Sequence, residues 1–514
     1  MDDNGLLKKI ISHCKANGFV FQSSEIYDGL GAVYDYGPYG SELKNNLKEY
    51  WWKSMTQLND NIVGLDSAIF MDPLTWKASG HVDAFNDPLI DNKDSKKRYR
   101  ADSLVEDYLS KITSKIDKEI VKARKRFGDN FDEKKYRETN DRIKKYTNEH
   151  ECISLRLNDI LNSNDLKGLK KIIQDLNIND PISGTSNWTD VKQFNLMFST
   201  EIGSNSEKSK KIYLRPETAQ GIFLNFLNVI NSTRVKIPFG IAQIGKAFRN
   251  EIIARQFIFR MREFEQMEMQ FFVEPGSEIK WYEEWKNKRL NWHESLGLGK
   301  DRYRFHDHKN LAHYANAACD IEFLFPMGYK ELEGIHSRTD FDLISHQKLS
   351  GKKINYFDQK SESSFVPYVV ETSIGLDRLF LAVMTASYRN EKLENGSERI
   401  VLKIPYEISP VKVAILPLNA KDNLPEKALE IYDSLKVHFN TQYDYKDSIG
   451  KRYRRQDAIG TPFCITVDYD SIKDNSVTLR NRDTMEQIRI SVDSVISHIK
   501  KHTSLNNLLK NFNG

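Results

Sequence analysis

Polar and aromatic side chains alternate with apolar ones along residues 262–272, and a shorter polar segment around Arg249 and Glu251 precedes them. Successive side chains of a strand point to opposite faces, so the two segments are expected to pair as strands with one polar and one apolar face. The expected polar face carries Arg249, Glu251, Phe264, Gln266, Glu268 and Gln270, and the apolar face Met267, Met269 and Phe271. A guanidinium, carboxylates and an aromatic ring on one face suit a nucleotide phosphate together with a small cation.

Two distant segments carry groups of the same kind: one reads RPETAQ from Arg215, and the other reads ETSIGLDR from Glu371. In the second segment Glu371 and Ser373 are two residues apart on a predicted strand and therefore share a face. Gly375 permits a tight turn into a helix, and Arg378 lies in its first turn. The chain has no GxxxxGK[ST] loop and no GxGxxG between a strand and a helix, so side chains would have to hold ATP.

The elements that position these residues are predicted from apolar spacing. Alternating or continuous apolar stretches predict an antiparallel sheet, closed by helices, with strands at residues 237–248, 261–273, 320–325 and 368–374. Residues 5–20 predict a short helix, and a glycine-rich stretch follows at residues 29–40. Intervals of three and four predict an amphipathic helix through Leu43, Leu47, Tyr50, Trp51, Met55 and Leu58. A core-facing role is favoured for this helix, and a dimer interface is the alternative.

Two further regions differ in composition from this predicted sheet. Residues 92–185 are dense in lysine, glutamate and aspartate and predict a mostly helical insertion, whose charged faces are either solvated surface or, less readily, a nucleic-acid contact. Residues 405–514 alternate strands with helices and predict a separate α/β domain. Its predicted strands are 412–417, 463–468, 476–481 and 487–491, its predicted helices are 425–439 and 492–502, and the last ten residues are an asparagine-rich tail.

Composition excludes several classes of protein. A chain of 514 residues with 39% hydrophobic and 29% charged residues is expected to form two or three domains. The net charge of +4 decides little about nucleic acid, because only a local basic patch would matter. The four cysteines, Cys14, Cys152, Cys319 and Cys464, form no CxxC pair, so we expect reduced thiols and no zinc. No apolar run is long enough to cross a membrane, and we expect a cytoplasmic protein.

Several of these strings together resemble a known family. FRNE, REFEQMEMQFF and GLDR resemble motifs 2 and 3 of class II aminoacyl-tRNA synthetases. YLRPETAQGIF, AHYANAACDIEF, KELEGIHSRTDFDL and YVVETSIGLDR look like glycyl-tRNA synthetases of the homodimeric type, and IGKRYRRQDAIGTPFCITVD is similar to that family's anticodon-binding domain. The resemblance implies an α+β fold with a class II antiparallel-sheet catalytic domain over residues 1–404, the helical insertion at 92–185, and an anticodon-binding α/β domain over 405–514.

The resemblance also implies an activity and its partners. The protein would activate glycine with ATP to glycyl-adenylate, release pyrophosphate, and transfer glycine to the 3′ end of tRNA(Gly) as a homodimer. ATP would bind with Mg²⁺, and Glu331 is the candidate for holding the metal. The implied catalytic residues are Arg249, Arg378 and Glu331, and the implied ATP contacts are Arg249, Asn250, Glu251, Phe259, Arg260, Met261, Arg262, Glu263, Phe264, Glu331, Leu332, Gly375, Leu376, Asp377 and Arg378.

Glycine offers only its ammonium and carboxylate groups for recognition, and carboxylates suit the ammonium. The implied glycine contacts are Arg100, Glu217, Phe264, Glu265, Gln266, Met267, Glu268, Glu371, Thr372, Ser373, Ile374 and Gly375, with Thr372 standing where many family members have proline. For tRNA the candidates are Arg255, Arg260 and Arg262 in the motif 2 loop and Lys451, Arg452, Arg454 and Arg455 around Tyr453 in the last domain.

Other interpretations stay open for single residues and for the whole chain. Arg249 alone fits a structural ion pair, Phe264 alone fits a core position, and the basic cluster of the last domain fits a solvated surface. For the chain, one alternative is a non-catalytic synthetase-like accessory subunit that binds nucleic acid. A second is an acyl-adenylating enzyme that does not use tRNA. The presence of Arg249, Glu371 and Arg378 argues against the first, and the last domain argues against the second.

Overall fold

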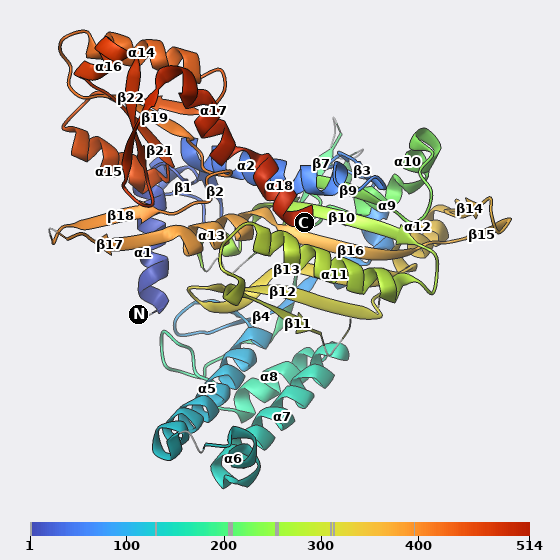
Figure 1. The fold of residues 1–514 in the computed structure, drawn as a ribbon. Helices are drawn as coiled ribbons and strands as arrows, with labels where there is room; N and C mark the ends of the chain where they lie inside the picture. The colour runs from blue at the N-terminus through green and yellow to red at the C-terminus, as the bar shows by residue number, and fades with distance from the viewer. Residues whose placement is uncertain are drawn as a thin grey trace. The chain divides into compact units, whose positions relative to one another are not determined.

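The computed structural model describes residues 3–128, 131–203, 209–251, 256–308, 311, 314–394 and 396–513 (Figure 1). The chain divides into two compact units, each described here by itself. The first comprises Met1–Ser79, Phe198–Arg249 and Ala254–Gly514, and the second comprises Gly80–Met197 and Asn250–Ile253. Among the described residues, no helix combines the length and apolar character needed to cross a membrane.

A seven-stranded sheet forms the centre of the first unit. Its strand order is β11-β12-β13-β16-β10-β9-β3, and every neighbouring pair is antiparallel except β3 and β9. The strands are β3 (Ile62–Gly64), β9 (Phe239–Phe248), β10 (Glu263–Val273), β11 (Tyr303–Asp307), β12 (Ala317–Phe325), β13 (Gly328–Thr339) and β16 (Tyr368–Gly375). The predicted antiparallel sheet is therefore confirmed, with strand ends shifted by a few residues.

The β9–β10 hairpin has the two faces that the sequence predicts. In its register Phe264 lies opposite Ala247, and Glu268 lies opposite Gln243. Met267, Met269 and Phe271 are buried in the main apolar core, as expected of the apolar face.

Three helices pack with this apolar face: α2 (Pro38–Thr56), α11 (Glu278–Ser295) and α13 (Leu376–Ser387). Leu43, Leu47, Tyr50, Trp51 and Met55 of α2 are all buried in the main core, so the core-facing interpretation of this helix is confirmed. A second apolar cluster surrounds Phe239 and Phe272 and includes residues of α9 (Ala219–Leu224), α10 (Phe226–Thr233) and α12 (Phe341–Ser350).

Smaller elements complete this part of the unit. The predicted N-terminal helix ends at Ala16, earlier than expected, because Gly18 adopts a positive φ and the chain turns there. The remaining elements are α1 (Asp3–Ala16), β1 (Val20–Gln22), β2 (Tyr34–Tyr36), α3 (Pro73–Ala78), β7 (Ser199–Ile202), β8 (Lys210–Tyr213), β14 (Tyr356–Asp358), β15 (Ser363–Phe365), β17 (Tyr388–Lys392) and β18 (Glu398–Leu402), with 3₁₀ turns η1 (Glu25–Tyr27), η4 (Phe257–Phe259) and η5 (Lys300–Arg302).

A five-stranded sheet follows in the C-terminal part of the first unit, with strand order β20-β19-β21-β22-β23. Its elements are β19 (Val413–Pro417), α14 (Leu424–Leu435), β20 (Thr441–Tyr443), α15 (Ile449–Ile459), β21 (Phe463–Val467), α16 (Tyr469–Asp474), β22 (Ser476–Asn481), β23 (Gln487–Ser491), α17 (Val492–Thr503) and α18 (Leu505–Asn513). The sequence did not predict β20, α15 or α16. The asparagine-rich last residues, for which no element was predicted, form α18.

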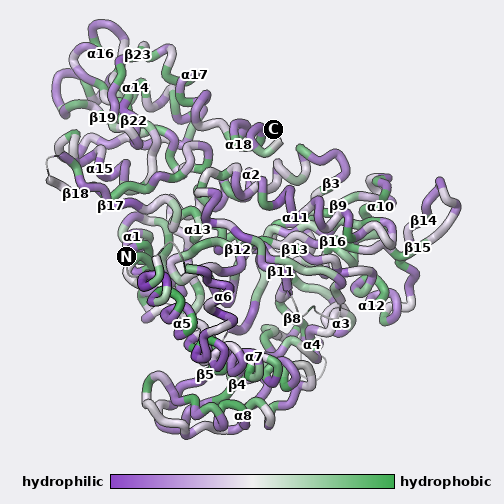
Figure 2. Tube along the Cα trace, turned by 60° about the horizontal axis from the view of Figure 1, so that its bottom comes forward, coloured by the Kyte–Doolittle hydropathy of each residue, from purple (hydrophilic) through white to green (hydrophobic). Residues whose placement is uncertain are grey.

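The second unit combines helices with a small sheet. Its helices are α4 (His81–Ala84), α5 (Ala101–Phe127), α6 (Glu133–Thr139), α7 (Asp141–Asn162) and α8 (Leu166–Asp175), and its strands are β4 (Asn86–Asp91), β5 (Arg98–Arg100) and β6 (Lys192–Asn195). Ile112, Ile116 and Ile120 of α5 are buried in the unit's own apolar cluster. Hydrophilic and hydrophobic stretches alternate along α5, which fits the expected charged outer face (Figure 2). The predicted helices are present, whereas the three strands were not expected.

Candidate active site

A row of polar side chains crosses one face of the seven-stranded sheet. Across the β13–β16 pair His336 lies directly opposite Glu371, and across the β16–β10 pair Glu371 lies opposite Gln270. The next row along pairs Glu268 with Ser373. All these residues share a face because they are at even spacings along their strands.

Hydrogen bonds join these side chains into one network. Glu371 accepts from His336 Nδ1 at 2.8 Å, from Arg338 Nη1 at 3.0 Å and from Gln270 Nε2 at 2.7 Å. Gln270 Nε2 also donates to Glu268 at 2.6 Å, and the Thr218 hydroxyl donates to the other oxygen of Glu268. Two carboxylates therefore lie beside one another, held by a shared amide.

The surroundings of these two carboxyls shift their pKa values in opposite directions. Burial raises the pKa of Glu268 well above its ordinary value, and the nearby charges of Glu371 and Glu217 add to this effect. Burial would also raise the pKa of Glu371, but Arg338 and His336 outweigh it and lower the pKa of Glu371. The site thus holds one carboxyl whose negative charge its neighbours stabilise beside one whose negative charge they oppose.

Arg338 and Glu217 connect this network to helices on the same face. Arg338 makes two hydrogen bonds to Asp342, at 2.8 and 3.1 Å, as well as its bond to Glu371. Gln220 Nε2 donates to Glu217 at 2.9 Å and to Asp342 at 3.0 Å. Three glutamates and one arginine therefore occupy a single connected site.

Two buried amide atoms at this site have no hydrogen-bond partner among the described residues: Gln270 Oε1 and Gln243 Nε2. A buried polar atom without a partner costs about 1–3 kcal/mol. The free oxygen suits an ammonium donor and the free amide nitrogen suits a carboxylate acceptor, which are the two ends of a small amino acid. A further bond, from Gln266 Nε2 to Ser373 Oγ at 3.4 Å, brings together two predicted glycine contacts.

Arg249 lies next to the segment that carries Glu217. Its Nε donates to the carbonyl of Pro216 at 3.1 Å, and its guanidinium lies 5.2 Å from the ring centroid of Phe264. Arg215 of the same segment is buried and donates to the carbonyl of Lys246 at 2.6 Å, which anchors the segment to β9. Arg249 is thus placed between an aromatic plane and the glutamate site.

Arg378 and Glu331 form a second part of the site. Arg378 Nη1 lies 2.9 Å from Glu331 Oε2, and its guanidinium lies 4.5 Å from the ring centroid of Phe259. The charge of Arg378 lowers the pKa of Glu331, which is therefore ionised at neutral pH. The ring nearest to Arg378 is Phe259, whereas Phe264 is the ring that faces Arg249.

A β-bulge at Leu332 determines the direction of Glu331. Glu322 of β12 pairs with Glu331, and the preceding Ile321 pairs with Glu333, so Leu332 is the extra residue. Leu332 is buried in the main core. Glu333 also points to the core side, where it pairs with Arg289 of α11. Without the bulge, Glu331 and Glu333 would share a face.

Several predicted contacts have side chains that point away from the polar face. Glu265 and Asp377 both pair with Lys44 of α2, at 2.5 and 2.9 Å. Strand alternation explains the direction of Glu265, because Phe264 and Gln266 take the polar face. The other predicted residues with buried side chains on the core side are Met267, Leu332, Ile374 and Leu376, and Thr372 lies between the two polar positions of β16.

The β9–β10 loop contributes fewer described contacts. Phe259 and Met261 are buried, Arg260 is half-buried, and Arg262 Nη1 donates to the carbonyl of Gly31 at 3.2 Å. Glu263 pairs with Lys246. Arg255 lies outside the described residues. Asn250 and Glu251 belong to the second unit. There the backbone N–H of Asn250 donates to the carbonyl of Leu196 at 2.7 Å.

Arg100 also belongs to the second unit. It pairs with Asp87 at 3.0 Å and with Asp102 at 2.6 Å. These two carboxylates outweigh the effect of burial and raise the pKa of Arg100. Both partners come from its own unit, so its predicted glycine contact stays a prediction.

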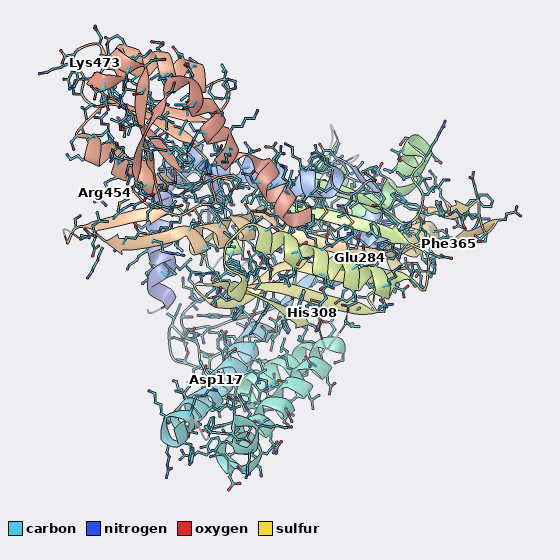
Figure 3. The ribbon with its side chains drawn as sticks, in the orientation of Figure 1. Asp117, Glu284, His308, Phe365, Arg454 and Lys473 are labelled. Atoms are coloured by element: carbon cyan, nitrogen blue, oxygen red, sulfur yellow. The ribbon has the colours of Figure 1, made fainter. Side chains whose placement is uncertain are left out.

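The basic cluster of the C-terminal region lies on helix α15, which the sequence did not predict. Arg452 is only 1% exposed and donates to the carbonyls of Pro417, Leu418 and Asp444, so burial argues against a direct tRNA contact for this residue. Arg455 pairs with Asp444 and Asp447, and Lys451 lies 3.7 Å from Asp447. Arg454 is half-buried and donates to the carbonyl of Glu398 at 3.4 Å, beside the β17–β18 hairpin (Figure 3).

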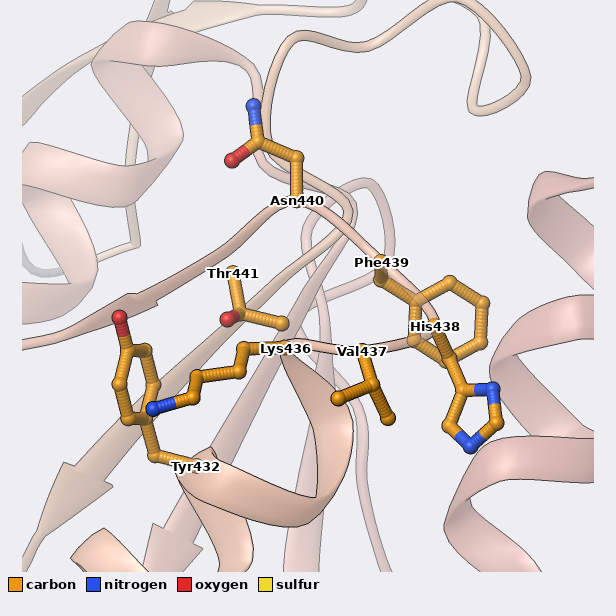
Figure 4. Close-up of a pocket in the computed structure, with 7 residues that line it drawn as sticks. All are labelled: Tyr432, Lys436, Val437, His438, Phe439, Asn440 and Thr441. Atoms are coloured by element: carbon orange, nitrogen blue, oxygen red, sulfur yellow. The ribbon is translucent and has the colours of Figure 1, made fainter.

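A hollow of about 420 Å³ lies in the same region, at the end of α14 (Figure 4). The ammonium of Lys436 lies 5.5 Å from the ring centroid of Tyr432, and the rings of His438 and Phe439 are 6.2 Å apart. Aromatic rings with a nearby cation suit an unpaired nucleobase.

The donor set around Glu331 fits a magnesium ion shared with a nucleotide. Mg²⁺ needs few protein oxygens when phosphates supply the rest, and an ionised carboxylate is a suitable ligand. Within the described residues, no group of three or more His, Cys, Asp or Glu side chains has the arrangement of a self-sufficient metal site. A metal at Glu331 would therefore depend on the phosphates.

Sequence reasoning missed Arg338, His336, Gln270 as a bridge, Gln243 and Thr218. Apart from Gln270, which lies two residues from Glu268 on β10, no spacing within one segment connects these residues to Glu268 or Glu371. Strand alternation could have found two of them. Gln270 lies two residues from Glu268, and Arg338 lies two residues from His336, so each shares the polar face.

Three family models match consecutive parts of the chain. A model described as glycyl-tRNA synthetase insertion domain 1 matches residues 87–196. A model of the tRNA synthetase class II core domain (G, H, P, S and T) matches residues 198–388, and one of an anticodon binding domain matches residues 412–502.

Curated relatives match almost the full length. A glycine–tRNA ligase of Chlorobaculum tepidum is 48% identical over 488 residues, covering 95% of this chain and 97% of the relative. A glycine–tRNA ligase of Treponema denticola is 47% identical over 508 residues, covering 97% and 98%. Among solved structures, a prolyl-tRNA synthetase of Cryptosporidium parvum complexed with L-proline and AMP has a TM-score of 0.56 at 13% identity, covering 98% of this chain and 77% of that one, which supports the fold alone.

Proposed function

This chain belongs to the glycine–tRNA ligase family of class II aminoacyl-tRNA synthetases, and we propose that its glutamate network binds the ammonium group of glycine beside ATP. The activity is the ATP-driven attachment of glycine to tRNA. The alternative of a non-catalytic accessory subunit has no support, because the relatives are named as ligases. One observation carries the site assignment: Glu268 and Glu371 share the donor Gln270 on one sheet face, and Arg249 contacts the segment that carries Glu217.

The first chemical step that we propose is attack of the glycine carboxylate on the α-phosphate of ATP. Negative charge on the phosphoryl oxygens is the main demand of such a step, and fixed cations meet it. Arg249 is the residue that we assign to the α-phosphate and the glycine carboxylate. Glu217, Glu268 and Glu371, with the Ser373 hydroxyl, are assigned to the ammonium group and thus orient the carboxylate for attack.

Arg378 and Glu331 are assigned to the other end of ATP. Arg378 would contact the γ-phosphate and adenine, and the ring of Phe264 would stack on the adenine with the guanidinium of Arg249 close by. Glu331 would hold Mg²⁺ together with the phosphates, where the ion would neutralise phosphate charge. Glu251, whose side chain the resemblance assigns to the adenine amino group, completes the proposed contacts.

Selection of glycine over alanine is proposed to be steric. The glutamates are held by Gln270 and Thr218, and we propose that this set encloses the ammonium position so closely that an added methyl group would clash. A clash is penalised heavily, whereas a missing methylene costs an enzyme only about 1–3 kcal/mol of discrimination. No editing site is needed under this proposal.

The remaining assignments concern partners and organisation. We assign residues 1–404 to catalysis, with the insertion at 92–185, and residues 405–514 to the tRNA anticodon. Lys451, Arg454 and Arg455 stay candidates for tRNA contact, with Arg255 and Arg260 for the acceptor stem. A homodimer in the cytoplasm is also proposed, and sedimentation equilibrium tests it, because the mass should be twice the 59.8 kDa of one chain.

Charging of tRNA by arginine variants tests the proposed site. Arg249→Ala and Arg378→Ala should each lower kcat/KM for glycylation by about 10²–10³-fold, as expected when a preorganised cation is removed from a developing negative charge. Arg389→Ala, which removes an exposed arginine of β17, is the matched control and should leave the rate unchanged. If Arg249→Ala charges tRNA as fast as the control, the assignment of this site fails.

A further inference from the structure

His336 of β13 directly contacts one of the proposed glycine ligands. It lies opposite Glu371 in the sheet register, and its Nδ1 is 2.8 Å from Glu371 Oε1. The other oxygen of Glu371 accepts from Arg338 and Gln270. The side chain of His336 is 21% exposed, so its ring can exchange a proton with water.

The backbone leaves room for this ring at Gly334. A Cβ atom on residue 334 would lie 2.9 Å from His336 Cε1 and 3.5 Å from His336 Nε2. The same Cβ would lie 3.7 Å from Asp320 Oδ1. Glycine at this position therefore lets the imidazole lie flat along the strand between Glu371 and Asp320.

Besides Glu331 of β13, whose pKa is lowered by Arg378 and in part by the charge of His336, four charged or titratable groups surround the imidazole. Glu371 comes from β16, Arg338 from β13 itself, and Asp320 from β12. The fourth is His308, which follows β11, bonds Asp320 at 2.8 Å and has its ring centroid 6.0 Å from that of His336 (Figure 3). Burial lowers the pKa of His336, but Glu371 outweighs it and raises the pKa above its ordinary value.

The two protonation states of His336 differ in what they leave to a ligand. The imidazolium and Arg338 together cancel the negative charge of Glu371. A bound ammonium group would need that negative charge. A neutral imidazole that keeps its Nδ1 proton still donates to Oε1 and so keeps the carboxylate in place, but it leaves the negative charge available. The ammonium group and the Nε2 proton therefore compete for the same carboxylate charge.

We propose that His336 is a positioning residue for glycine, which holds Glu371 through Nδ1–H and releases its Nε2 proton to water when the glycine ammonium binds. The proposal rests on the assignment of Glu371 as an ammonium ligand. Glycine enters with its ammonium charge, the Nε2–H bond of His336 breaks, and water takes up that proton. Glycine binding accordingly strengthens as pH rises through the pKa of His336 and weakens as pH falls.

Pyrophosphate exchange measured against glycine and against ATP tests this coupling. Between about pH 6 and about pH 8.5, the wild-type KM for glycine should fall about five- to tenfold with rising pH, while the KM for ATP stays constant. His336→Asn keeps a donor at the position of Nδ1 without a charge, so its kcat should be retained and its KM for glycine should vary less with pH. His336→Ala loses the donor and should have a raised KM at every pH.

His306→Asn is the matched control, because it removes an exposed histidine of β11 from the same sheet.

Calorimetry of glycine binding in buffers of different ionisation enthalpy counts the released protons without any variant. Wild-type protein should release more protons than His336→Asn, since the contribution of Glu268 is common to both. Equal proton release, or identical pH profiles, would overturn the proposal. A Glu371→Gln variant with an unchanged KM for glycine would instead overturn the underlying site assignment.

Discussion

At the scale of single residues, Glu268 and Glu371 differ only in their neighbours. Glu268 is buried beside two other glutamates, so its pKa is raised, whereas Glu371 lies against Arg338 and His336, so its pKa is lowered. A cation that enters beside both carboxyls relieves the repulsion that opposes the charge of Glu268. This property suits an ammonium ligand better than a permanently charged pair, which would be costly to bury empty.

Glu371→Gln tests this view of the site. The substitution removes the negative charge but keeps an oxygen for Arg338, so the fold should be retained. Loss of a charged hydrogen bond costs about 1.5–3 kcal/mol, and the KM for glycine should therefore rise by about 10- to 150-fold. The KM for ATP should change much less, and both constants can be read from pyrophosphate exchange.

The control for this variant is Glu274→Gln, an exposed glutamate that follows directly after β10. It should behave as wild type in both constants. A Glu371→Gln protein with an increased KM for ATP and an unchanged KM for glycine would contradict the assignment of the ammonium group to this carboxylate.

The sequence predicted the strand face of some residues of the proposed site but not of all. Alternation along β10 and β16 correctly separated Glu268 and Glu371 from the core side. Carrying over whole strings by resemblance also included Glu265, whose side chain reaches Lys44 on the other face. Arg338 and His336 could not be predicted as partners of Glu371, because their contact depends on the pairing of strands that are distant in sequence.

At the scale of elements, one bulge separates two carboxylates with different tasks. Leu332 is the extra residue in β13, so Glu331 faces Arg378, and Glu333 enters the core behind the sheet. There Glu333 pairs with Arg289 at 2.6 Å and with His293 at 2.6 Å, and all three are buried. These contacts fix helix α11 on the sheet.

Glu333→Gln should destabilise the protein strongly. It leaves the guanidinium of Arg289 buried without a charge partner, which costs about 3–5 kcal/mol. Glu284→Gln is the matched control on α11, the helix that carries Arg289. Its pair with Lys288 is half-exposed and worth only about 0.3–0.5 kcal/mol (Figure 3). Urea unfolding of both variants measures the difference. Equal midpoints would show that the buried pair does not hold α11.

Strong alternation and regular apolar spacing made the central strands and α2 predictable. Helix α15 was not predicted, because its sequence IGKRYRRQDAI is dominated by charged residues that suit a loop equally well. Its helical state depends on tertiary contacts, such as the buried Arg452 that caps three carbonyls of neighbouring segments. Composition alone carries no information about such contacts.

At the scale of the whole chain, the last helix returns to the first unit's main core. Helix α18 packs on α2 and α11, and Leu508 and Leu509 are buried there with residues of the central sheet. Its apolar residues Leu505, Leu508, Leu509 and Phe512 do stand at helical intervals, but the asparagine-rich composition hid this signal. The end of the chain therefore supports the same core as the strands of the proposed active site.

Leu508→Ala should lower the free energy of unfolding by about 2–5 kcal/mol, the cost of removing a buried leucine side chain from a packed core. Lys510→Ala, an exposed position on the same helix, is the control and should change it by less than about 0.5 kcal/mol. Urea unfolding followed by tryptophan fluorescence reports on this core. Identical curves for the two variants would mean that α18 does not contribute to it.

The most direct test of the central claim is amino-acid-dependent exchange of pyrophosphate into ATP by the unmodified protein. The proposed glutamate site predicts saturable exchange with glycine, and exchange near background with alanine and serine at the same concentrations. It also predicts that Glu371→Gln restores exchange only at much higher glycine concentrations. Exchange that proceeds without glycine, or equally well with alanine, would contradict the claim.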